Sequence, residues 1–154
     1  MGNRVVISEN VTVIGSSLSI YGGAANEIVK GTDLTVLSGT YINIFGGSKD
    51  VMVEGDVNLT VGGNTNSSID ITDTKSASYR IYGGSNKAND GIKGKINLTF
   101  TGNAKAHYIF GGSLGNGKIN EINFNYTGGS SANAYGGSTN GDNQCDVNLK
   151  NYRW

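Results

Sequence analysis

The sequence predicts an all-β fold: a single-stranded parallel β-helix (β-solenoid) whose chain winds through three-sided coils. Two repeated patterns predict this fold, an aromatic residue followed by two glycines and a phrase of alternating apolar and polar residues. First glycines of the aromatic-Gly-Gly triplet lie 24, 37, 28 and 25 residues apart. Periods of this size indicate one structural unit per repeat, stacked on the next. The five triplets are Tyr21-Gly22-Gly23, Phe45-Gly46-Gly47, Tyr82-Gly83-Gly84, Phe110-Gly111-Gly112 and Tyr135-Gly136-Gly137.

The alternating phrase supplies the first strand of each coil. Alternation with a period of two indicates a strand with one buried face. No window shows apolar residues at i, i+3, i+4 and i+7, so we expect almost no helix. The apolar centres of the phrase, which form one inward column, are Val11, Leu34, Leu59, Leu98, Phe124 and Leu149.

A second strand leads into each glycine pair, as in Ile42–Phe45, and a short third apolar piece, as in Val51–Val53, leads into the next coil. Three short strands in about 24 residues match one coil of a three-sided parallel β-helix. We therefore expect one domain over residues 1–154 with about six coils, wound right-handed as natural three-sided β-helices mostly are. Glycine pairs suit the second corner because glycine accepts a positive φ.

The aromatic residues of the triplets are the first candidate binding site. A third inward column of Ile20, Ile44, Ile81, Ile109 and Ala134 would send the neighbouring rings outward by alternation. Exposed aromatic rows can stack on sugars or form a patch for a protein partner. In the alternative, the corner breaks the alternation and the rings pack inward or under the glycine loops, a burial that two phenylalanines favour. The candidate residues are Tyr21, Phe45, Tyr82, Phe110 and Tyr135, with Tyr108 beside them.

A second candidate surface is the outward face of the first strands. Its regular polar array resembles the Thr-rich ice-binding faces of some β-solenoid antifreeze proteins, with Asn-x-Thr in place of Thr-x-Thr. In the alternative, threonine is simply a good strand residue, and stacked asparagines hydrogen-bond as ladders. The residues of this face are Thr12, Thr35, Thr60 and Thr99, beside Asn58 and Asn97.

Composition excludes several classes of function. Lysine plus arginine and aspartate plus glutamate both number 12, so no basic excess attracts nucleic acid or an anionic membrane. The single cysteine, Cys145, excludes an intrachain disulfide and a cysteine zinc site. No stretch approaches the roughly 18 apolar residues of a membrane span, and the start lacks the apolar region of a signal peptide. A cytosolic protein fits these facts, and so does an excised piece of a secreted one.

The sequence offers no assembled catalytic group, and we expect no enzyme activity, cofactor or metal. His107 is the only histidine and has no serine or cysteine partner in a motif. Paired carboxylates are needed for glycoside hydrolysis, and the loose candidates are Asp33, Asp56, Asp70 and Asp73.

Two features depart from the regular repeat. Residues 66–78 form a polar insertion that we expect to project as a loop or small hairpin. No amphipathic cap helix covers either end, although Val5-Val6-Ile7 could add one strand at the start. Because uncovered terminal coils pair with other chains, we expect a piece of a longer solenoid or end-to-end self-association.

The aromatic-Gly-Gly corners after two alternating strands resemble the degenerate β-helical repeats of bacterial cell-surface and adhesin-like proteins. The resemblance extends from about Val11 to Asn151. It implies a non-catalytic, rigid extracellular stalk, or a surface that binds a glycan or a host or cell-surface protein. It also implies an extracellular location, with the chain as an internal fragment.

Overall fold

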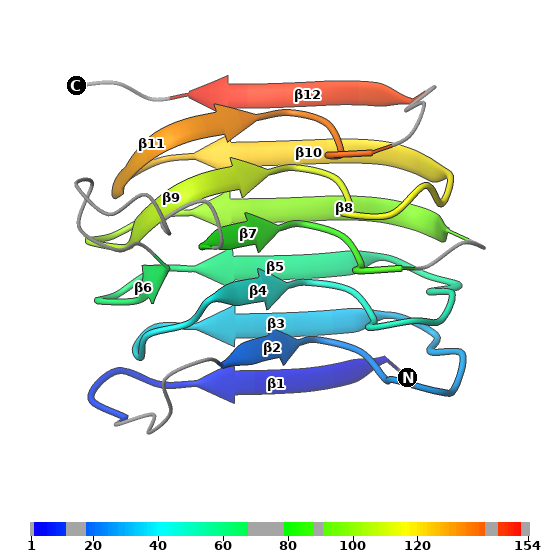
Figure 1. Ribbon diagram of the computed structural model, residues 1–154, viewed down its shortest axis with the longest axis horizontal. Helices are drawn as coiled ribbons and strands as arrows, with labels where there is room; N and C mark the ends of the chain where they lie inside the picture. The colour runs from blue at the N-terminus through cyan, green and yellow to red at the C-terminus, as the bar shows by residue number, and fades with distance from the viewer. Residues whose placement is uncertain (1, 12–17, 68–78, 88–90, 141–144, 152–154) are drawn as a thin grey trace.

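The computed structural model describes residues 2–11, 18–67, 79–87, 91–140 and 145–151, which form strands and connecting turns without a helix (Figure 1). All pairings between the strands are parallel. The strands are β1 (Asn3–Ile7), β2 (Ser19–Tyr21), β3 (Thr32–Val36), β4 (Asn43–Phe45), β5 (Val57–Val61), β6 (Asn66–Ser67), β7 (Arg80–Tyr82), β8 (Ile92–Phe100), β9 (Lys105–Phe110), β10 (Ile119–Tyr126), β11 (Ser130–Tyr135) and β12 (Asp146–Asn151).

Successive strands alternate between two parallel sheets, except that β6 and β7 both lie in sheet B. Sheet A has the order β1-β3-β5-β8-β10-β12, and sheet B has the order β2-β4-β7-β9-β11, with β6 also beside β9. The described strands make five coils and begin a sixth with β12 (Figure 1). A short third side is held by parallel bridges from Val29 to Val53 and from Val53 to Ile92. The predicted all-β solenoid is confirmed.

Apolar side chains from both sheets stack in columns inside the coils. Leu34, Leu59, Leu98 and Phe124 lie in register on neighbouring strands, and each is at most 1% exposed. No single coil could bury such residues, whereas stacking buries them continuously. Leu149 occupies the same column on β12 but is 53% exposed, because no described coil lies beyond it.

The first coil begins earlier than the repeated phrase predicts. Val5 on β1 pairs with Leu34, whereas Val11 is 45% exposed and lies outside the strands. Val5, Val6 and Ile7 are all β-branched and favour a strand, but so are Val11 and Thr12, so strand propensity does not distinguish the two segments. Asn10 has a φ of 62°, which turns the chain away from the sheet after β1. The placement of Val11 in the inward column is therefore wrong.

The glycine pairs serve close contact between coils, and the expectation of positive φ at these pairs is wrong. Positive φ occurs at other glycines, such as Gly63 and Gly102 between the two sheets. A Cβ on Gly83 would lie 2.2 Å from the carbonyl oxygen of Gly111, and Gly22, Gly46 and Gly111 meet a glycine carbonyl oxygen of the next coil in the same way. A Cβ on Gly136 would instead meet the side chain of Val147. Neighbouring coils therefore approach too closely for any side chain at this corner.

A serine ladder runs beside the glycine pairs. The backbone N–H of Ser48 donates to Oγ of Ser85 (3.0 Å), that of Ser85 to Ser113 (2.9 Å), and that of Ser113 to Ser138 (2.8 Å). Serine follows the glycine pair in four of the five triplets. This repeated position in the sequence therefore indicates the serine ladder. These bonds satisfy backbone donors at the corner, where the strand ladder ends.

The insertion in the third coil starts later than residue 66. Asn66 and Ser67 form β6, which pairs with Lys105 and Ala106 of β9. Arg80 then rejoins sheet B opposite Tyr108. Residues 66 and 67 thus belong to the coil, and residues 68–78 lie outside the described part of the chain.

Candidate functional site

The five aromatic residues of the triplets form one continuous stack along sheet B. Ring centroids of successive members are 4.9, 4.8, 5.2 and 5.1 Å apart, and their planes lie within 13° of parallel. The strand register sets this spacing, because Tyr21 pairs with Phe45, Phe45 with Tyr82, Tyr82 with Phe110 and Phe110 with Tyr135. We call these five rings the aromatic ladder.

Burial within the aromatic ladder changes from the middle to the end. Phe45 is 2% exposed and Tyr82 is fully buried, although neither belongs to the apolar clusters that fill the coils. Tyr21 and Phe110 are half-buried, and Tyr135 is 47% exposed. The middle rings are therefore buried outside the two apolar clusters, whereas the ring at the C-terminal end of the ladder is exposed.

Stacking limits what the aromatic ladder offers to a ligand. A sugar ring packs against the face of an aromatic ring, and each inner face of the ladder is already covered by its neighbour. Tyr82, at the centre, has no accessible surface at all. Contact with a ligand is thus confined to the ends of the ladder.

A pocket of about 190 Å³ lies at the C-terminal end of the ladder. It is lined by Arg80, Tyr108, Phe110, Tyr135 and Thr139. Three of the six residues predicted as an aromatic binding site, Tyr108, Phe110 and Tyr135, therefore come together here. Tyr21, Phe45 and Tyr82 do not line it.

Strand alternation places Tyr108 on the same face of β9 as Phe110, with ring centroids 6.3 Å apart. Arg80, one coil away on β7, holds its guanidinium carbon 6.0 Å from the centre of the Tyr108 ring. Arg80 also donates a hydrogen bond of 3.2 Å to the hydroxyl of Tyr82. These contacts orient a cation beside aromatic surface, which suits a polar ligand that carries acceptor oxygens.

The outward face of sheet A carries the predicted threonine column in register. Thr35 pairs with Thr60 and Thr60 with Thr99, and all three are half-buried. Val6 occupies this column on β1, and Thr12 lies outside the described residues. The column continues with Asn125 and Lys150, so its threonine part is three coils long.

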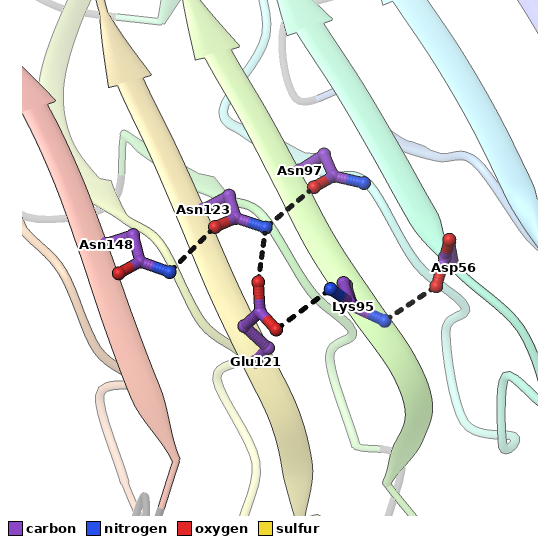
Figure 2. A network of polar contacts seen from close by, with 6 residues as sticks. All are labelled: Asp56, Lys95, Asn97, Glu121, Asn123 and Asn148. Atoms are coloured by element: carbon purple, nitrogen blue, oxygen red, sulfur yellow. Dashed lines mark hydrogen bonds and ion pairs between the residues drawn. The ribbon is translucent and has the colours of Figure 1, made fainter.

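Asparagine side chains on the same face bind one another (Figure 2). Nδ2 of Asn97 donates to Oδ1 of Asn58 (2.9 Å), Asn123 donates to Asn97 (3.0 Å), and Asn148 donates to Asn123 (3.0 Å). We call this the asparagine ladder. Because these amides hydrogen-bond within the protein, they are less available to order water or ice, and ice binding stays an untested prediction.

A charged network borders the asparagine ladder (Figure 2). Nζ of Lys95 lies 3.0 Å from a carboxylate oxygen of Glu121, and Asn123 also donates to Glu121. Hydrogen bonds from Lys95 and then Asn123 hold the pKa of the Glu121 carboxyl below its usual value. The backbone N–H of Lys95 donates to Asp56.

The two acidic candidates in the described part of the chain each contact a basic side chain or a backbone group. Asp33 lies 3.8 Å from Arg4, and Asp56 is held by the backbone of Lys95. Asp70 and Asp73 lie outside the described residues. His107 packs edge-on against Tyr108, with centroids 4.5 Å apart. Within the described ranges, no three histidine, cysteine or acidic side chains cluster as metal ligands would.

No protein-family model, curated protein or solved structure matches the chain. The search of the described residues for a helix long and apolar enough to cross a membrane finds none.

Proposed function

We propose that this chain is a non-catalytic, structural and adhesive β-helix segment of a bacterial surface protein, and that its C-terminal aromatic pocket binds a glycan. The observation that carries the proposal is the pocket lined by Arg80, Tyr108, Phe110, Tyr135 and Thr139. The aromatic ladder is buried over its middle coils, and its exposed end at Tyr135 lies in this pocket with the guanidinium of Arg80.

The pocket matches the chemistry of a sugar in three ways. Tyr135 is 47% exposed and offers ring surface to the C–H groups of a pyranose. Arg80 supplies N–H donors for hydroxyl or carboxylate oxygens, and Thr139 supplies a hydroxyl. The volume of about 190 Å³ is below the range of about 300–1,000 Å³ typical of drug-sized ligands, so it fits one sugar unit of a chain.

The solenoid explains how such a site would be held. Tyr108 and Arg80 sit on paired strands of a stacked sheet, so their spacing follows from strand register and not from a loop. Sites built on strands keep their geometry better than sites on loops. A rigid stack that presents a small pocket suits attachment. The proposed surface location rests on the resemblance to adhesin-like repeats.

The test is a glycan array that includes neutral and acidic sugars, followed by calorimetric titration of any glycan retained. We expect Tyr108→Ala to weaken binding at least about tenfold, the effect of an aromatic residue that carries binding energy. Tyr21→Ala is the matched control, because it removes a tyrosine ring of the aromatic ladder that does not line the pocket. No retained glycan, or equal affinities for both variants and the unaltered protein, would reject the proposal.

The non-catalytic part of the proposal has its own test. Incubation with the retained glycan, and with acidic polysaccharides, is expected to release no reducing ends. Release above that of a heat-denatured sample would show that the chain is an enzyme.

A further inference from the structure

We propose that the chain binds a second copy of itself head to tail, through parallel pairing of β12 of one copy with β1 of the next. These two strands are the outer edges of sheet A. An edge strand presents a row of backbone groups able to pair with another chain. The inference is independent of glycan binding, because it concerns the opposite sheet and the ends of the stack.

The apolar column inside sheet A ends in exposed residues at both edges. Val5 is 39% exposed and Leu149 is 53% exposed, whereas Leu34 and Phe124, next to them in the column, are fully buried. The pairing that holds within the molecule, continued by one strand, places Leu149 against Val5 of a second copy. Each would then gain the neighbour that its column lacks.

The asparagine ladder gives this contact a direction. Each Nδ2 donates to the Oδ1 of the preceding coil, so the last carbonyl of the ladder, Oδ1 of Asn148, lies on the side of the residue away from Asn123 (Figure 2). At the other edge, the same column ends in Arg4, whose side chain is 74% exposed and lies 3.8 Å from Asp33. A guanidinium has five N–H donors, so Arg4 can keep Asp33 and also donate to Asn148 of another copy.

Donor and acceptor ends meet only when the head of one copy contacts the tail of another. The strands of sheet A all run in the same direction, so this contact repeats the parallel pairing found inside the molecule. A symmetric head-to-head contact would pair the strands antiparallel and would interrupt the columns. Head-to-tail contacts form rings or open series according to their geometry. Because this contact continues the stack of coils along one axis, a linear series of copies is expected. The expected pairs, first copy named first, are Val147 with Asn3, Asn148 with Arg4, Leu149 with Val5, Lys150 with Val6, and Asn151 with Ile7.

The winding of the chain limits the contact to sheet A. Sheet B ends at β11, one coil before β12, so the pairing leaves the width of one strand between β11 and β2 of the second copy. Tyr135 and Tyr21 of the second copy would then lie two strand spacings apart, about 9.6 Å, and would not stack. Lys150 meets Val6 and gains no acidic partner. We therefore expect reversible, concentration-dependent association.

Sedimentation velocity over a series of protein concentrations tests the proposal. The unaltered chain is expected to form species at successive multiples of 16.1 kDa. Val5→Lys blocks the head and Leu149→Lys blocks the tail, and each variant alone is expected to remain a monomer, with its dissociation constant raised at least about tenfold. Both sites are exposed, and circular dichroism checks that the fold is kept. Thr60→Lys, on the outer face of a middle strand, is the matched control and is expected to associate like the unaltered chain.

The mixture of the two blocked variants separates the proposal from other contacts. Val5→Lys keeps an intact tail and Leu149→Lys an intact head, so the equimolar mixture is expected to form a 1:1 dimer and no larger species. An unaltered chain that stays monomeric at every concentration would overturn the proposal. So would association that stops at a dimer, or association that only one of the two blocks abolishes.

Discussion

Tyr82 stacks on Phe45 with ring centroids 4.8 Å apart and planes 3° from parallel, although the two residues are separated by 37 positions and by the longest insertion in the chain. The paired strands β4 and β7 hold the two rings in register. The separation between these rings is close to the strand spacing of about 4.8 Å, so stacking of the coils sets the ladder. Local sequence sets only which position carries the ring.

Removal of a middle ring of the aromatic ladder should cost far more than removal of the end ring. Tyr82→Ala opens a cavity at a fully buried site with a ring on each side, and we expect a loss of about 3–5 kcal/mol of unfolding free energy. Tyr135→Ala, at a 47% exposed site, should lose about 1 kcal/mol. Denaturant unfolding measures both values. Equal losses would mean that the contribution of each ring to the unfolding free energy does not depend on its burial.

The glycine pairs should reject even a methyl group. A Cβ on Gly83 would lie 2.2 Å from the Gly111 carbonyl oxygen, which is backbone and cannot turn aside, so Gly83→Ala should cost about 3 kcal/mol. Gly62 is the control, since the nearest atoms to its added Cβ would be side-chain carbons, at 3.1 and 3.4 Å, with the nearest backbone oxygen at 3.8 Å. Gly62→Ala should change the unfolding free energy by less than about 1 kcal/mol. If Gly83→Ala changes the unfolding free energy as little as Gly62→Ala, the close approach of the next coil does not explain why position 83 is glycine.

Tyr41 offers a stabilising substitution. Its side chain is 2% exposed, burial raises the pKa of its hydroxyl, and that hydroxyl has no hydrogen-bond partner among the described residues. Tyr41→Phe removes an unsatisfied polar group and should gain about 1 kcal/mol in denaturant unfolding. Tyr126→Phe is the matched control, because that hydroxyl lies 3.3 Å from Ser131 and its loss should destabilise. A loss at Tyr41 would instead reveal a partner for the hydroxyl.

Glu121 should make stability depend on acid pH. Its pKa is lowered in the folded state by hydrogen bonds from Lys95 and Asn123, so the folded protein binds fewer protons there than the unfolded chain. The stabilisation is present above the usual pKa of 4.5 and is lost as pH falls through the lowered folded value. The melting temperature of Glu121→Gln should therefore lie below that of the unaltered chain at neutral pH, and the two should converge as the pH falls through the lowered pKa of Glu121. A constant difference would exclude this linkage.

The fold was predictable because two periodic signals agree. Alternation at Leu34, Leu59 and Leu98 indicated strands, and the repeated triplets indicated coils. The phrase at Val11 misled because alternation alone cannot tell which of two nearby segments pairs with the sheet. Val5 pairs there, and the turn at Asn10 leaves Val11 outside.

The candidate site was predictable only in part. Alternation predicts that the rings of the triplets lie on the face opposite Ile44 and Ile81, but it says nothing about what covers that face. Mutual stacking at strand spacing buries the middle rings, and this depends on contacts between residues far apart in sequence. Arg80 and Thr139 could not be predicted as pocket residues, because they lie on different coils and meet only when the coils stack.

Glycan titration with paired tyrosine variants tests the central claim, that the ligand binds where the aromatic ladder opens. We predict that a glycan retained by the unaltered chain binds Tyr21→Ala with unchanged affinity and Tyr108→Ala at least about tenfold more weakly. Unchanged affinity in Tyr108→Ala, or an array on which no glycan is retained, would contradict the account.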